Sequence, residues 1–391
     1  MRKTVAKVFT ILLMTSLFGL YAESKKAYTF TKPYTYKNIS IFLIEGKETK
    51  PDMKYTILSE AMKKKLIVVK ETGTVSQLTV ENVSKTETLF IQAGDIVKGG
   101  KQDRVLTVDM VLPPNSGPQP IASFCVEQSR WAKRGKESVS SFSQSDNNLV
   151  SKELRNGALN QGSSQSKVWK YVEKQQGKYN KNLKTDVKKN ESASSLQLAL
   201  ENKDLKKELA NYKVNLNDIL DKHPNAIGFA YCVNGQFSRA DVYMNRKLFS
   251  DLWPKLLNSS IMEAIGDFDE KKKEIKLDKT WQEKVLVKRK HNKQFNKKLN
   301  NGVTWTNNDY DQYFSNRSYN EKEDYLVHES WDIKVEIPKE VELQNNDLNG
   351  IDLNGIDIQQ IENLIEQNEE NQEKQNNKKI ELPQSNENNK K

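Results

Sequence analysis

The feature that most constrains the fold is a pair of apolar runs joined by Asn234-Gly235, in the stretch AIGFAYCVNGQFSRADVYM. Asn-Gly between two apolar runs is a strong short-range signal for a β-hairpin, because a type I′ turn needs positive φ at both turn positions. The chain is therefore expected to contain antiparallel β-structure at this point.

Other segments extend this expectation into a fold class. Apolar and polar residues alternate in further strand-like segments, which begin at 36–46 and continue through 93–126. Helical spacing of apolar residues predicts helices within 164–213 and over 246–265. The expected fold is α+β, a mostly antiparallel β-sheet with packed α-helices.

The composition suggests one folded domain with polar extensions. Only 36% of the 391 residues are hydrophobic, so not every segment can bury enough apolar surface to order itself. We expect a single α+β domain over 36–265, interrupted by a mobile Ser- and Asn-rich loop at about 132–163. A basic, aromatic-containing extension is expected over 268–335, and a disordered Asn/Gln/Glu/Lys-rich tail over 338–391.

Residues 1–22 have the pattern of a signal peptide. A short basic region precedes an apolar run from Val8 to Leu20, and the small residue Ala22 follows. The run is short for a transmembrane helix, which needs about 20 residues. An uncleaved anchor is the alternative. We expect a periplasmic or secreted protein with no transmembrane helix in the mature chain.

Export bears on the two cysteines, Cys125 and Cys232. In an oxidising compartment they could form a disulfide, worth on the order of 4 kcal/mol for so long a loop. The alternative is two separate buried thiols. The three histidines, His223, His291 and His328, are scattered without ligand spacing, so we expect neither a metal nor another cofactor.

The net charge of +10 is concentrated in the basic run 279–300, which also contains Trp281 and Phe295. Such a run could contact nucleic acid or anionic envelope polymers. An exported protein seldom meets nucleic acid, and no nucleic-acid-binding motif accompanies the run. We therefore expect a solvated basic segment and no nucleic-acid partner.

Two polar groups are the candidate ligand-binding site. The first is in AGDIVKGGKQDRVL, where Gly99 and Gly100 permit a tight hairpin turn. The second, in SFCVEQSRW, ends the strand that carries Cys125. The candidate residues are Lys101, Gln102, Asp103 and Arg104 from the first group, and Glu127, Gln128, Arg130 and Trp131 from the second.

Two interpretations of these groups remain open. They could converge around a polar or anionic ligand, with Arg104 or Arg130 binding in a bidentate manner and Glu127 acting as a base if desolvated. Alternatively, they could satisfy one another and cap the ends of the sheet. No Ser-His-acid set and no G-x-S-x-G motif is present to indicate a reaction.

Four stretches follow one another along the chain: AGDIVKGGKQDRVL, SFCVEQSRW, SKVWKYV and VNGQFSRADVYMNRKLFSDLWPKLL. Over about 36–265 the chain resembles the ARG and rhodanese-phosphatase-superfamily-associated protein domain, a bacterial domain of unknown function. The resemblance implies a domain organisation and no reaction. If the family has a site, the matching positions are Lys101, Gln102, Arg104, Cys125, Glu127, Gln128, Arg130 and Trp131.

The expected function is that of an exported binding or interaction protein. Its partner would be an unknown polar or anionic ligand or an envelope protein. The alternative is an envelope enzyme that uses the polar clusters Lys101–Arg104 and Glu127–Arg130, with Cys125 as a further candidate group.

Overall fold

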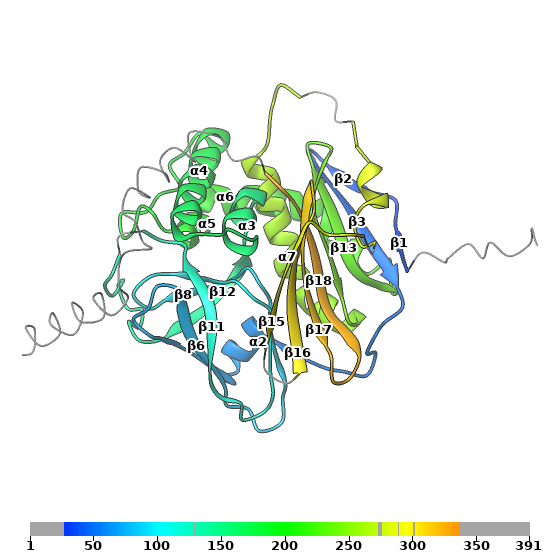
Figure 1. The fold of residues 1–391 in the computed structure, drawn as a ribbon. Helices are drawn as coiled ribbons and strands as arrows, with labels where there is room; N and C mark the ends of the chain where they lie inside the picture. The colour runs from blue at the N-terminus through cyan, green and yellow to red at the C-terminus, as the bar shows by residue number, and fades with distance from the viewer. Residues whose placement is uncertain (1–26, 129, 273–275, 288, 300–301, 336–391) are drawn as a thin grey trace, which may run out of the picture. The chain divides into compact units, whose positions relative to one another are not determined.

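The computed structural model describes residues 27–335, apart from 129, 273–275, 288, 300 and 301 (Figure 1). The expected signal peptide at 1–22 and the expected tail at 338–391 lie outside the described residues and stay predictions. The described part combines three mostly antiparallel sheets with helices, which confirms the α+β class.

The largest sheet has nine strands, all paired antiparallel. Its strands are β1 (Tyr28–Phe30), β2 (Tyr34–Tyr36), β3 (Ile39–Gly46), β13 (Ala226–Val233), β14 (Gln236–Tyr243), β15 (Lys293–Lys298), β16 (Val303–Asp309), β17 (Tyr313–Asn320) and β18 (Tyr325–Ile333). The order is β1-β3-β13-β14-β18-β17-β16-β15, with β2 also paired to β3. Asn234 and Gly235 have φ values of 53° and 81°, which confirms the hairpin at the centre of this sheet.

The expectation that 268–335 is an extension outside the α+β domain is wrong, because this segment contributes strands to the nine-stranded sheet. Strand β18 pairs with β14, and β17, β16 and β15 follow in turn, so this segment completes the sheet. Its strands lack a simple apolar alternation because several of their buried residues are polar and bond to one another. Asn307 Nδ2, for example, donates to Asn316 Oδ1 at 2.7 Å. Such side chains can be buried because they are hydrogen-bonded.

A six-stranded sheet carries the segment with the candidate site. Its strands are β5 (Ile67–Glu71), β6 (Gln77–Asn82), β8 (Asp95–Gly99), β9 (Arg104–Leu106), β11 (Gly117–Cys125) and β12 (Phe142–Asn148), in the order β12-β8-β9-β11-β6-β5. A bridge between Lys70 and Ser141 brings the two outer strands of this sheet together. A third sheet consists of β4 (Thr56–Ile57), β7 (Leu89–Ile91) and β10 (Met110–Leu112), with β4 parallel to β7.

The helices are α2 (Leu58–Lys63), α3 (Lys152–Leu159), α4 (Gln165–Leu183), α5 (Leu196–Leu200), α6 (Lys203–Leu216) and α7 (Arg246–Gly266), with 3-10 turns η1 (Asn217–Ile219) and η2 (Thr280–Glu283). Within 164–213, Asn202 begins a new helix by accepting bonds from the N–H groups of Asp204 and Leu205. Helix α7 continues through Pro254. None of the described helices is long and apolar enough to cross a membrane.

The loop expected at about 132–163 contains strand β12 and helix α3, so its lack of regular structure was predicted wrongly. The polar residues of this segment act as caps and core bonds. Ser151 caps α3 by accepting from the N–H of Leu154, and Asn148 Nδ2 donates to Asp95 Oδ1 at 3.3 Å. The polar residues that made this segment resemble a loop instead cap a helix and form hydrogen bonds in the core.

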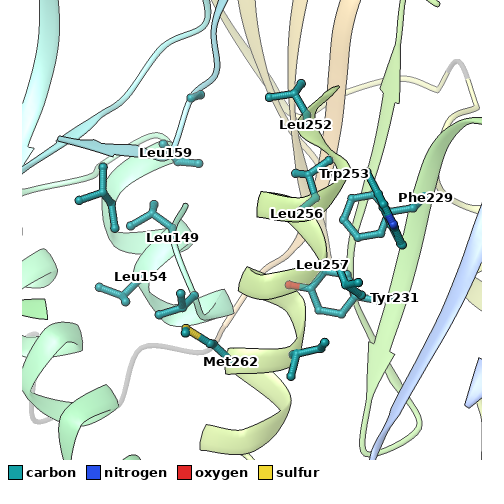
Figure 2. Close-up of a cluster of buried hydrophobic side chains, with 14 of the residues drawn as sticks. Leu149, Leu154, Leu159, Phe229, Tyr231, Leu252, Trp253, Leu256, Leu257 and Met262 are labelled. Carbon is teal, nitrogen blue, oxygen red and sulfur yellow. The ribbon is translucent and has the colours of Figure 1, made fainter. Parts of the chain in front are cut away.

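The main core lies between α7 and its neighbours. Figure 2 shows the side chains of α7 between α3 on one side and β13 on the other. Trp253 meets Phe229 edge to face, with ring centroids 5.6 Å apart. Burying one large apolar side chain stabilises a fold by about 1.5–3 kcal/mol, so this contact fixes α7 against the sheet.

Candidate functional site

The two predicted polar groups lie side by side because of strand register. Strand β9 pairs antiparallel with β11, and Arg104 stands opposite Cys125. The turn before β9 begins at Gly99 and Gly100, with φ values of 116° and 57°. A Cβ at Gly100 would lie 2.3 Å from Phe142 Cζ, so glycine is needed there for space as well as for φ.

Four of the charged side chains form what we call the turn cluster: Asp103, Glu127, Arg130 and Arg134. Their side chains are at most 8% exposed. The guanidinium of Arg134 donates to both oxygens of Asp103 at 2.9 Å, and Nη1 also donates to Glu127 at 3.2 Å. Arg130 Nε donates to Glu127 at 2.7 Å. Two carboxylates thus face two guanidiniums, and the charges balance.

Further bonds close the turn cluster. Asp103 also accepts from Ser195 Oγ at 2.8 Å and from the N–H of Gly99 at 3.0 Å. Gln102 Nε2 donates to the carbonyl of Glu127 at 2.9 Å. These contacts correspond to the interpretation in which the polar groups satisfy one another. Arg134, which the sequence analysis did not select, is a central member.

Protonation in the turn cluster follows from burial and pairing. Burial raises the pKa of Asp103, against the hydrogen bond from Arg134. Burial also opposes ionisation of Glu127, but the hydrogen bond from Arg130 and its other donors hold the pKa of Glu127 below its usual range. Glu127 is therefore an ionised, fully engaged carboxylate, which makes it a poor general base.

Cys125 lies against the buried guanidinium of Arg104. Arg104 Nη1 contacts Cys125 Sγ, and Nη2 donates to Glu71 Oε1 at 3.2 Å. Burial raises the pKa of Cys125 to about 11, although Arg104 favours the thiolate. Burial likewise raises the pKa of Cys232 to about 12 in a separate apolar cluster. The structure therefore favours two separate buried thiols over a disulfide, and a protonated thiol is a weak nucleophile.

The exposed part of the site is small. Trp131 is 45% exposed, and its ring centroid lies 4.9 Å from Lys101 Nζ and 5.7 Å from the guanidinium carbon of Arg104. We call Lys101 and Trp131 the Trp131 surface. Gln128 is also exposed and lines a separate hollow of about 180 Å³. The other predicted residues of the site lie at or near full burial.

A larger set of buried charges was missed by the sequence analysis. This sheet cluster consists of Asp109, Arg155, Arg239, Asp241, Glu263, His328 and Asp332. Each of these residues is at most 4% exposed. They come from α3, α7, β14, β18 and the segment between β9 and β10, so only the tertiary structure brings them together.

The sheet cluster is a continuous chain of ion pairs. Arg155 donates to Glu263 at 2.9 Å and to Asp332 at 2.5 Å. Arg239 donates to Asp332 at 2.9 Å and to Asp241 at 2.7 Å, and so links these two carboxylates. Strand register places Arg239 directly opposite Asp332.

His328 ends the chain of ion pairs. Its Nε2 lies 3.0 Å from Asp241, and its Nδ1 lies 2.8 Å from Asp109. Burial alone would lower the pKa of His328, but the carboxylates of Asp109 and Asp241 outweigh it and raise the pKa to about 9. His328 is therefore a protonated structural cation near neutral pH. Among the described residues, no cluster of His, Cys, Asp and Glu is arranged to hold a metal ion.

A scan against protein families matches residues 27–331. The match extends beyond the expected 36–265 and includes the strands β15 to β17 and most of β18. Comparisons with curated proteins and with solved structures produced no match. The chain belongs to the family defined by the ARG and Rhodanese-Phosphatase-superfamily-associated Protein domain.

Proposed function

We propose that this chain is an exported binding or interaction protein that engages a polar or anionic ligand, or an envelope protein, at the Trp131 surface. The observation that carries the proposal is an exposed indole held over a buried cation. Arg104 is fixed by Glu71 and Cys125, and Trp131 lies against it with Lys101 alongside. Tryptophan anchors often dominate binding energy, and a preorganised anchor costs little entropy to use.

The chemistry of the turn cluster and of the neighbouring Cys125 supports binding over catalysis. The carboxylates of Asp103 and Glu127 already accept bonds from arginines, and the pKa of Cys125 is raised to about 11. A general base or thiolate at this place would need one of those groups to be free. The enzyme alternative therefore has less support than the binding function.

Export is supported by the signal-peptide pattern over 1–22. Cell fractionation and N-terminal sequencing of the native protein test it. We expect a mature chain that begins near Glu23 in the periplasm or the medium. A chain that retains Met1 and stays in the cytoplasm would contradict export.

Thermal-shift screening of the mature protein tests binding at the Trp131 surface. The panel consists of nucleotides, amino acids and acidic peptides, because a compound that binds only the native state raises the melting temperature. Each hit is titrated again with Trp131→Ala and with Phe295→Ala, a control at another exposed aromatic residue. We expect Trp131→Ala alone to weaken binding, by about 2 kcal/mol. Hits that bind Trp131→Ala as tightly as the wild type would disprove this location.

A further inference from the structure

Two adjoining hollows lie beside the nine-stranded sheet, and none of the residues that line them belongs to the six-stranded sheet. Each has a volume of about 340 Å³, and Lys284, Gln312 and Tyr313 line both of them. Because the two hollows share these residues, we treat them together and call them the η2 groove, after η2, which borders the second hollow. Sites for small ligands usually measure about 300–1,000 Å³.

The lining of the η2 groove has more basic than acidic residues. Lys284, Arg289 and Lys290 line its first hollow, and none of the three has a carboxylate within 4.0 Å among the described residues. The nearby Lys334, by contrast, pairs with Asp309 at 2.7 Å. Lys284 donates to Gln312 Oε1 at 3.3 Å and Arg289 donates to the carbonyl of Glu283, so these two cations have neutral partners only. Cations without a paired carboxylate favour a negatively charged ligand.

Two acidic residues line the groove, and neither forms an ion pair within 4.0 Å among the described residues. Asp311 accepts from Asn292 Nδ2 at 2.9 Å. Asp278 accepts from the N–H of Thr280 at 2.8 Å, and this bond, with a smaller contribution from Lys284, lowers the pKa of Asp278. Both carboxylates are held by neutral donors, so they reduce the positive charge of the groove, but its lining still has more basic than acidic residues.

Aromatic and amide side chains complete the lining. The rings of Tyr310 and Trp331 stack with centroids 4.8 Å apart and an interplanar angle of 20°. Trp331 is buried behind Tyr310, which stays partly exposed and offers a rigid ring. Asn292 and Gln312 present amides, which can both donate and accept hydrogen bonds.

We propose that the η2 groove binds an acidic oligosaccharide, a chain of sugar rings that carry carboxylates. The carboxylates would meet Lys284, Arg289 and Lys290, and the apolar face of one ring would pack on Tyr310. The hydroxyl groups would bond to the amides. A ligand of phosphates alone would use the cations and leave the amides and the aromatic ring without a role.

Calorimetric titration of the mature protein with a tetramer of galacturonate tests this site. The triple variant Lys284→Gln/Arg289→Gln/Lys290→Gln removes the three cations. Its control, Lys203→Gln/Lys206→Gln/Lys207→Gln, removes three exposed cations from α6. We expect the groove variant to bind the tetramer at least about tenfold more weakly, which corresponds to about 1.4 kcal/mol, and the control to bind as the wild type does.

Further measurements complete the test. Rising salt should weaken binding, Tyr310→Ala should weaken it at constant charge, and the neutral tetramer maltotetraose should not bind. Trp131→Ala should leave binding of galacturonate unchanged. The proposal is overturned if galacturonate does not bind, if both triple variants bind alike, or if inorganic polyphosphate or an oligonucleotide binds more tightly than galacturonate.

Discussion

The turn cluster and the sheet cluster both bury charged side chains, but they differ in how far apart their residues lie along the chain. Both bury arginines against carboxylates. The turn cluster draws on residues 103–134, lies beside an exposed tryptophan and balances two negative charges with two positive ones. The sheet cluster draws on residues 109–332 and joins four carboxylates to two arginines and His328.

The comparison teaches that buried charge has two uses in this molecule. In the turn cluster it shapes a local loop below a candidate binding surface. In the sheet cluster it links α3 and α7 to β14 and β18, so the last strand is tied to the centre of the fold. Breaking a fully buried pair leaves an uncompensated charge, which is more costly the deeper the pair lies.

The largest effect is expected from Arg155→Met. The substitution leaves the carboxylates of Glu263 and Asp332 without Arg155, so the free energy of unfolding should fall by about 3–5 kcal/mol. Urea denaturation measures it, and Lys170→Met at an exposed position of α4 serves as control. A loss no larger than that of the control would show that the sheet cluster does not stabilise the fold.

A smaller effect is expected from Arg134→Met in the turn cluster. Asp103 would lose both guanidinium bonds, but Ser195 and the N–H of Gly99 would still donate to it. The expected loss is about 2 kcal/mol, again from urea denaturation. Lys133→Met, at an exposed neighbouring position, should change little. A loss greater than that of Arg155→Met would reverse the comparison.

The pH dependence of stability should distinguish the two clusters further. His328 has a pKa of about 9 in the folded protein against about 6.5 when unfolded, so the folded state binds the proton more tightly. Its contribution is fully present below pH 6.5 and is lost as the pH rises through 9. Relative to His328→Gln, the wild type should therefore lose stability between pH 7 and 9.5. Parallel curves for the two proteins would argue against a protonated His328.

The smallest difference is expected between Cys125 and Cys232 in their rates of reaction with a maleimide. With pKa values of about 11 and 12, Cys125 and Cys232 should both react slowly with a maleimide at pH 8 in the native protein. After denaturation without reductant, two thiols per chain should react promptly, as mass spectrometry would show. No reactive thiol in that sample would demonstrate a disulfide instead.

Local patterns predicted much of the framework. Asn234-Gly235 predicted the hairpin, and Gly99-Gly100 predicted the turn before β9. In each case neighbouring residues decide the conformation, so one sequence suffices. The prediction failed at 268–335, where buried asparagines and serines replace the apolar residues that normally reveal a strand.

The candidate site was predictable in part for the same reason. Residues in 99–104 and 125–131 have charges and glycines that stand out locally, and the structure brings the two groups together. Arg134 was missed because it lies in a polar stretch without periodicity. The seven members of the sheet cluster are scattered along the sequence and share no motif. Only Arg239 and Asp241 lie close together in the chain.

The sequence by itself determined the α+β class, the central hairpin and the tight glycine turn, because these depend on backbone preferences and short-range patterns of polarity. Only the tertiary structure decided which charged side chains form buried ion pairs and which have no ion-pair partner. Glu127 is paired with Arg130 and Arg134, whereas Lys284, Arg289 and Lys290 have no carboxylate within 4.0 Å in the described part of the chain. The reason is physical: a charge is neutralised by whatever lies within a few ångströms of it, and strand pairing between distant segments sets those neighbours.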